Sequence, residues 1–189
     1  MNILRFAFAG ALFLATTTSA VVAQAAEFIT IQLKDGPVVV ELNDKVAPKH
    51  VERIKALATA GEYDNVAFHR VIEGFMAQTG DVQYGDMSAG FQPDAAGTGG
   101  SSQPDLPQEF SDVPFERGTV GMARSQDPNS ANSQFFIMFA PGDFLNGQYT
   151  VVGKVVSGME NVDKIKRGDE ANNGSVTDPD RMIKVTVGK

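Results

Sequence analysis

The chain has 189 residues and a formal net charge of −7, and it contains no cysteine. The acidic balance argues against nucleic-acid binding, which requires a basic footprint, and against a polybasic membrane-binding patch. The absence of cysteine excludes disulfide bonds and cysteine nucleophiles, and the length suits one domain with a sizeable core.

Residues 1–25 have the layout of a secretory signal peptide. A polar start carrying Arg5 precedes an apolar run over residues 6–15, and an Ala-Gln-Ala sequence ending at Ala25 provides a small-residue cleavage site. A membrane anchor is the alternative, but spanning a bilayer needs about 20 apolar residues. The sequence therefore predicts cleavage after Ala25 or the next alanine. It leaves one domain over residues 26–189, free of the membrane and located in the periplasm or outside the cell.

The mature chain begins with a predicted hairpin. Apolar and polar residues alternate over residues 29–33 and again over 38–42, and the Asp-Gly pair at 35–36 joins the two runs. A helix is expected next, because Pro48 suits a first helical position and Gly61 is placed to end the helix.

The rest of the chain reads mainly as short strands. Strand-like segments are expected at residues 66–72, 76–79, 119–123, 133–138, 150–156 and 183–187. A second short helix is expected over residues 159–165, with Gly168 as its stop, and residues 83–107 read as a long surface loop. Many short strands with two isolated helices favour a mainly β, closed antiparallel barrel.

The segment around Glu73 and Gly74 is the strongest candidate for chemistry. A three-residue connection there would place Arg70 opposite Gln78 on one face, whereas a two-residue turn would shift the register and place Arg70 opposite Ala77. The pattern leaves both open. One fixed cation, an amide and large apolar side chains, with no usual nucleophile and no metal-ligand set, suit a reaction that breaks no covalent bond.

Three runs carry a resemblance to a known family: FHRVIEGFMAQTGD at residues 68–81, SQFFI at 133–137 and VGKVV at 152–156. They resemble the cyclophilin peptidyl-prolyl cis-trans isomerases, in order and over essentially the whole mature chain. The resemblance implies an eight-stranded, closed antiparallel barrel with two capping helices. It also implies a monomer without a cofactor, acting on proline-containing unfolded or flexible polypeptides.

The resemblance also implies roles for individual residues. Arg70 matches the catalytic arginine, and Gln78 matches the glutamine that orients it and touches the substrate backbone. The expected substrate-binding residues are Phe75, Met76, Ala123, Arg124, Gln134, Phe136, Phe144, Leu145 and Tyr149. Tyr149 and Phe144 stand where many eukaryotic members have His and Trp. Glu73 stands where many have Pro, a change expected to loosen the turn.

Several other interpretations remain beside this one. A chaperone module that binds peptides without turnover could use the same apolar groove, whereas a hydrolase lacks a supported nucleophile–base pair. His69, on the face opposite to Arg70, is expected to be a buried histidine rather than a general base. Gly97 to Gly100 could suggest a phosphate loop, but no Lys-Ser/Thr follows.

Overall fold

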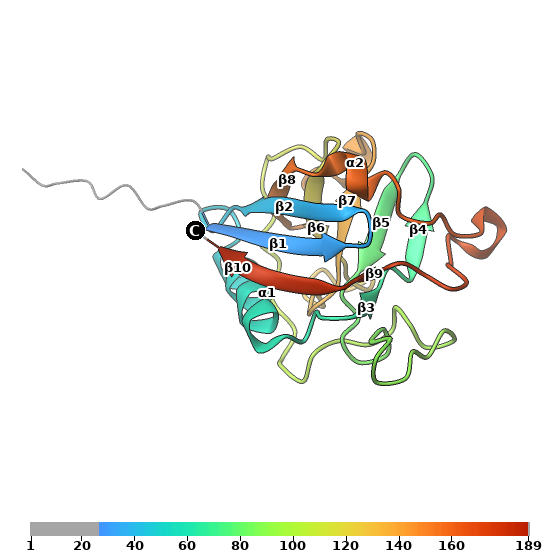
Figure 1. The fold of residues 1–189 in the computed structure, drawn as a ribbon. Coiled ribbons are helices and arrows are strands. Elements are labelled where there is room, and N and C mark those ends of the chain that lie inside the picture. Colours follow the sequence, from blue (N-terminus) through green and yellow to red (C-terminus); the bar gives the residue numbers. More distant parts are fainter. Residues whose placement is uncertain (1–26, 189) are drawn as a thin grey trace, which may run out of the picture.

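The computed structural model describes residues 27–188, and strands predominate among them (Figure 1). The elements are β1 (Glu27–Leu33), β2 (Gly36–Leu42), α1 (Pro48–Ala60), β3 (Val66–Ala67), β4 (Arg70–Ile72), β5 (Met76–Thr79), β6 (Thr119–Met122), β7 (Phe135–Met138), η1 (Asp143–Leu145), β8 (Val151–Ser157), α2 (Met159–Val162), η2 (Glu170–Asn172), β9 (Arg181–Met182) and β10 (Lys184–Gly188). The predicted signal peptide, residues 1–25, and its cleavage site lie outside the described residues. None of the helices within 27–188 has the length and apolar character needed to cross a membrane.

Eight strands form one antiparallel sheet in the order β10-β1-β2-β8-β6-β7-β5-β4. The mainly β architecture and the eight strands agree with the expectation from the sequence. Closure of the barrel is not confirmed, because β4 and β10 end the sheet and do not pair with each other. The chain instead forms a separate two-stranded sheet from β3 and β9, the strands that directly precede β4 and β10.

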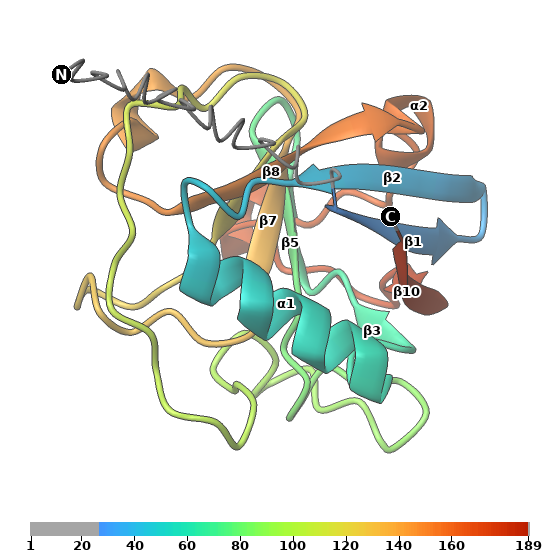
Figure 2. The ribbon, with the colours of Figure 1, turned by 90° about the vertical axis from the view of Figure 1, so that its left-hand side faces the viewer.

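The predicted hairpin and the first helix are confirmed. Strands β1 and β2 pair from Glu27↔Leu42 to Leu33↔Gly36, and α1 starts at Pro48 and ends before Gly61, whose φ is 77°. This left-handed conformation suits glycine. Helix α1 and helix α2 lie at opposite ends of the curled sheet (Figures 1 and 2), and Val51 and Ile54 of α1 share one apolar cluster with Val162 of α2.

The start of α1 is capped by a residue from a distant loop. The backbone N–H groups of Lys49 and His50 donate to the Glu109 carboxylate, at 3.2 Å each, and Nδ1 of His50 lies 2.7 Å from the same carboxylate. A carboxylate is favourable there because the first N–H groups of a helix have no partner within it. This contact ties the loop before β6 to α1.

The second helix is shorter than expected, with α2 covering only residues 159–162. After it, Ile165 N–H bonds to the Val162 carbonyl three residues back, and Gly168 N–H bonds across to Val71 of β4. The apolar residues expected to lie on a longer helix are therefore divided between α2 and a tighter turn after it. This turn directs the chain toward the β4 edge of the sheet.

Apolar side chains gather in two clusters on opposite faces of β7. Phe135 belongs to the large cluster, which includes Tyr63 and most buried residues of β1, β2 and α1. Phe136 belongs to a smaller cluster with Met76, Phe115 and Leu145. The smaller cluster borders the candidate site.

A buried carboxylate closes the base of the long loop after β5. Asp81 accepts backbone N–H bonds from Gln83 (3.1 Å) and Tyr84 (2.9 Å), and also from Gly97 (2.7 Å) and Gly99 (3.0 Å). Residues 83–99 therefore leave and rejoin the domain at the same point, as expected for a surface loop rather than a linker.

Candidate active site

The turn between β4 and β5 has three residues, Glu73 to Phe75, and it settles the register that the sequence left open. Arg70 pairs with Gln78, and Ile72 pairs with Met76. Phe75 N–H bonds to the Ile72 carbonyl at 3.1 Å, and Gly74 has a φ of 68°. A left-handed third position is what several tight turns require and what glycine supplies without strain.

The register aligns the candidate residues in a row across neighbouring strands. Arg70 of β4 pairs with Gln78 of β5, which pairs with Phe136 of β7, which in turn pairs with Gly121 of β6. A side chain at Gly121 would collide with two rings, because its Cβ would lie 2.7 Å from Phe136 Cζ and 2.5 Å from Phe115 Cε1. Glycine at this point leaves room for the stacked pair of rings that forms the floor of the site.

These residues border a hollow of about 450 Å³. Its lining residues are Arg70, Phe75, Met76, Gln78, Ala123, Arg124, Phe136, Phe144, Leu145, Gln148 and Tyr149. Gln134, also expected from the sequence, lines an adjoining hollow of about 360 Å³ that shares Gln78, Ala123 and Arg124 with the first. Sequence reasoning missed Gln148, which has no signal beyond its place beside Tyr149.

The guanidinium of Arg70 is held on two sides by neutral oxygen atoms. Its Nη1 donates to Gln78 Oε1 at 3.2 Å, its Nε donates to the carbonyl of Asn173 at 3.0 Å, and its Nη2 donates to Asn173 Oδ1 at 3.0 Å. Burial lowers the pKa of Arg70 below its usual value. An arginine nevertheless stays charged at working pH. Asn173 is a site residue that sequence reasoning missed.

Gln78 is itself oriented by a chain of hydrogen bonds. Its Nε2 donates to Gln134 Oε1 at 2.9 Å, and Gln134 Nε2 donates to the Gly99 carbonyl at 2.8 Å. Gln78 therefore presents its carbonyl oxygen to Arg70. This series of hydrogen bonds connects the Arg70 guanidinium with the loop over residues 83–99, which Asp81 holds in place.

Arg124 lines both hollows and contacts Tyr149, which lines the first. The Arg124 guanidinium lies 4.4 Å from the centre of the Tyr149 ring and donates to the Gln148 carbonyl at 2.9 Å. The Tyr149 ring meets the Phe136 ring edge-on, with centroids 5.9 Å apart. The Arg124 side chain therefore packs against the Tyr149 ring instead of extending into solvent.

The outer rim of the larger hollow is apolar. Phe144 is 65% exposed, and its ring contacts Phe75 with centroids 5.4 Å apart. The next residue, Leu145, is buried. A large exposed aromatic ring beside a lined hollow is a typical ligand contact.

The Glu73 substitution does not leave the turn without support. Glu73 pairs with Nε of Arg167 at 2.6 Å, and the Arg167 guanidinium lies 4.1 Å from the centre of the Phe139 ring. The expected loosening of the turn is therefore opposed by an ion pair, although an exposed pair contributes only about 0–1 kcal/mol.

His69 lies on the other face of β4 and is 6% exposed. Burial lowers the pKa of this imidazole. The position agrees with the expectation of a buried histidine. The glycine segment beside it does not form a phosphate loop, because the N–H groups of Gly97 and Gly99 already bond to Asp81.

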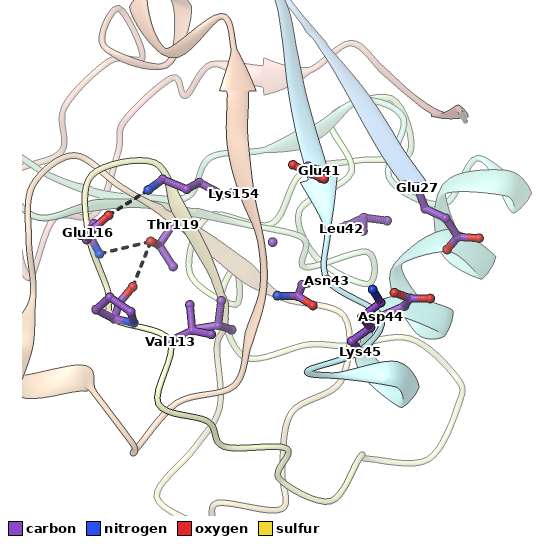
Figure 3. Close-up of a pocket in the computed structure, with 13 residues that line it drawn as sticks. Glu27, Glu41, Leu42, Asn43, Asp44, Lys45, Val113, Glu116, Thr119 and Lys154 are labelled. Carbon is purple, nitrogen blue, oxygen red and sulfur yellow. Dashed lines mark hydrogen bonds and ion pairs between the residues drawn. The ribbon is translucent and has the colours of Figure 1, made fainter. Parts of the chain in front are cut away.

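Another hollow, of about 500 Å³, lies between β2, β8 and the segment before β6 (Figure 3). Its lining is rich in charged side chains, including Glu41, Lys45, Glu116 and Lys154, and the last two pair at 2.8 Å. It contains none of the predicted site residues. Within residues 27–188, no group of three or more His, Asp or Glu side chains is arranged to hold a metal ion.

Similarity to known proteins points to one family. Residues 28–187 match the family model described as "Cyclophilin type peptidyl-prolyl cis-trans isomerase/CLD". The chain is 62% identical to a "Probable peptidyl-prolyl cis-trans isomerase" of Brucella suis, over 99% of this chain and 97% of that protein. It is 43% identical to a "Peptidyl-prolyl cis-trans isomerase-like 2" of Cryptococcus neoformans, over 74% of this chain but only 23% of that longer protein.

Solved structures share the fold. A cyclophilin-type isomerase of Cryptosporidium parvum has a TM-score of 0.73 at 26% identity, covering 87% of this chain and 99% of that one. The same type of protein in the presence of the dipeptide Ala-Pro gives 0.72 at 27% identity, covering 86% and 99%. A cyclophilin from Hirschia baltica gives 0.68 at 23% identity, covering 84% and 73%.

Proposed function

Because the chain belongs to the cyclophilin-type peptidyl-prolyl cis-trans isomerases, we propose that Arg70 and its apolar hollow accelerate rotation about X-Pro bonds in folding proteins. The substrates are proline-containing segments of unfolded or flexible polypeptides. The observation that carries the proposal is the placement of one charged guanidinium, held by neutral acceptors, at the edge of a hollow lined by Phe136, Met76 and Leu145.

The chemistry follows from amide resonance. Rotation about a peptide bond costs about 18–20 kcal/mol because it breaks the conjugation of the nitrogen lone pair with the carbonyl. In the twisted state that lone pair can accept a hydrogen bond. Arg70 donates to the prolyl nitrogen, an interaction made mainly in the transition state and therefore one that raises the rate.

The apolar residues bind the proline ring while the rest of the peptide turns. Phe136 forms the floor with Phe115 stacked behind it, their centroids 5.7 Å apart. Gln78 contacts the substrate backbone and keeps Arg70 in place. No covalent bond changes, so the mechanism uses neither a nucleophile nor a cofactor.

The test is a cis-to-trans assay on a short X-Pro peptide, comparing the wild type with Arg70→Ala. Loss of one preorganised donor typically costs about 10²–10³ in rate. The oxygen acceptors of Arg70 lie at partly or fully exposed contacts, so water can replace it and the melting temperature should change little. A folded Arg70→Ala protein with wild-type turnover would contradict the mechanism. A wild type that binds the peptide but does not accelerate exchange would favour a chaperone module.

We further propose that the chain is exported and cleaved near Ala25, and acts as a monomer in the periplasm or outside the cell. The charge and apolar pattern of residues 1–25 supports this, and cleavage there leaves β1, which begins at Glu27, intact. N-terminal sequencing of the exported protein tests the proposal. An uncleaved protein in the membrane fraction would indicate an anchor instead.

A further inference from the structure

The loop over residues 168–176 lies directly beside β4, the strand that carries Arg70. Gly168 N–H bonds to the Val71 carbonyl at 2.9 Å, Val71 N–H bonds to the Gly174 carbonyl at 2.8 Å, and Val176 N–H bonds to the His69 carbonyl at 3.1 Å. The loop therefore continues the hydrogen bonding of the sheet at its β4 end. Its backbone is fixed relative to Arg70 even though Asn173 itself is exposed.

Asn173 presents two acceptors to one edge of the guanidinium. Its backbone carbonyl accepts from Nε and its side-chain Oδ1 accepts from Nη2, both at 3.0 Å. Arginine has five N–H groups in a planar fork. With Nη1 bonded to Gln78, three of them donate to oxygen, which leaves one N–H on each terminal nitrogen. Nη1 also lies 3.9 Å from the Met76 sulfur, and a thioether accepts only weakly. A substrate can therefore compete for both remaining N–H groups.

The backbone at this position favours asparagine over other acceptors. Asn173 has a φ of 52°, in the left-handed region that Asn adopts more readily than most residues. The next residue, Gly174, has a φ of 78°, and a Cβ there would lie 2.4 Å from Ile72 Cγ1. The Asn-Gly pair thus lets the chain turn tightly against β4 while the amide of Asn173 points to Arg70.

The neutrality of the amide matters as much as its position. Among residues 27–188, no carboxylate forms an ion pair with Arg70, and the oxygen atoms that accept its hydrogen bonds all belong to amides. A carboxylate would compete with the substrate for the positive charge. An amide orients the guanidinium and leaves its charge available.

We propose that Asn173 is a positioning residue for the reaction, fixing the plane of Arg70 so that its remaining N–H groups face the proline in the hollow. This inference rests on the proposed function of Arg70. It predicts that the side-chain amide of Asn173 contributes to turnover through Arg70 and not through stability.

The test is Asn173→Gly, which keeps the backbone carbonyl and the left-handed conformation but removes Oδ1. The loss of one charge-assisted hydrogen bond predicts a fall of about tenfold in kcat, with KM little changed. The melting temperature should not fall. Asn65→Gly is the matched control, because Asn65 has a φ of 64° and lies outside the site.

The same change is then made in Arg70→Lys, which keeps the charge but lacks the planar fork. In the Arg70→Lys background, Asn173→Gly should lower kcat by less than about twofold, since lysine cannot make the paired bonds. Wild-type turnover in Asn173→Gly overturns the inference. Equal losses in the wild-type and Arg70→Lys backgrounds overturn it too, because they show a general structural effect. Either failure leaves the proposed function intact as long as Arg70→Ala is inactive.

Discussion

Phe135 and Phe136 allow a test of the pocket within one dipeptide. Both lie in β7 and are almost fully buried, at 0% and 5% exposure, yet they face opposite sides of the sheet. Phe135 meets Tyr63 edge-on at 5.6 Å, whereas Phe136 stacks on Phe115 at 5.7 Å. The perturbation is leucine at either position, made separately.

Both changes should cost moderate stability. Phe135→Leu removes one aromatic pair and Phe136→Leu removes two, with Phe115 and Tyr149, and each pair is worth about 0.5–1.5 kcal/mol. Either change also alters the shape of a well-packed site at a further cost of up to about 1.5 kcal/mol. A domain of ordinary stability, about 5–15 kcal/mol, remains folded after such a loss. Alanine is less suitable, because truncating a buried Phe costs about 3–5 kcal/mol.

The activities should differ. Phe136→Leu reshapes the floor that receives the proline ring, and small changes in an apolar pocket alter kcat/KM by about 10–200-fold. Phe135→Leu should retain nearly full activity. Urea unfolding and the X-Pro assay at low temperature measure the two effects separately. The pocket assignment would be refuted by equal activity losses in both variants, or by full activity in Phe136→Leu.

Two further predictions follow from other residues. Burial lowers the pKa of His50, and this outweighs the opposing effect of Glu109, so the folded state favours the neutral ring. The unfolded chain then binds more protons, and stability should fall as the pH drops below about 6.5, the unfolded value. Thermal melts between pH 7.5 and 5 should show a smaller fall in melting temperature for His50→Gln than for the wild type. An unchanged dependence of the melting temperature on pH would exclude His50 as the cause. Cyclosporin-sensitive members of the family carry a Trp whose indole N–H bonds the drug where this chain has Phe144. Phe lacks that donor, and the loss of one buried hydrogen bond costs about 1–3 kcal/mol of binding free energy. We therefore expect weak inhibition of this protein by the drug. Phe144→Trp should tighten drug binding about 10–100-fold with little change in turnover. Titration of both proteins with the drug checks this, and equal tight inhibition would disprove it.

Local patterns predicted the parts of the fold that local chemistry determines. The Asp-Gly turn and the Pro48 and Gly61 boundaries of α1 follow from backbone preferences of single residues, and both are as expected. The length of α2 and the closure of the barrel depend on where distant segments dock. Periodicity carries no information on that docking, and these expectations were not met in full.

In the candidate site, too, local sequence predicted some features and the docking of distant segments determined the others. Residues of the first two family-like runs line one hollow and none of the third run does. The register within the first run depended on a turn length that Glu73 and Gly74 alone could not decide. Asn173 lies 103 residues from Arg70 in the chain and belongs to a loop without any period. Its Asn-Gly pair marks a left-handed turn, yet only the docking of that turn against β4 reveals its contact with Arg70.

The Asp81 carboxylate gives the loop after β5 a modular character. It bonds to both ends of residues 83–99, as a disulfide at the neck of a loop would do, in a protein that has no cysteine. Closing the neck in this way means that added length at the tip costs little, since loop entropy grows only slowly with length. Ser88 to Gly90 are exposed, and a Cβ at Gly90 would meet nothing within 4 Å. An epitope or a small domain fused at this tip should leave the isomerase beneath it undisturbed, which makes the loop a natural point of attachment for display on the domain.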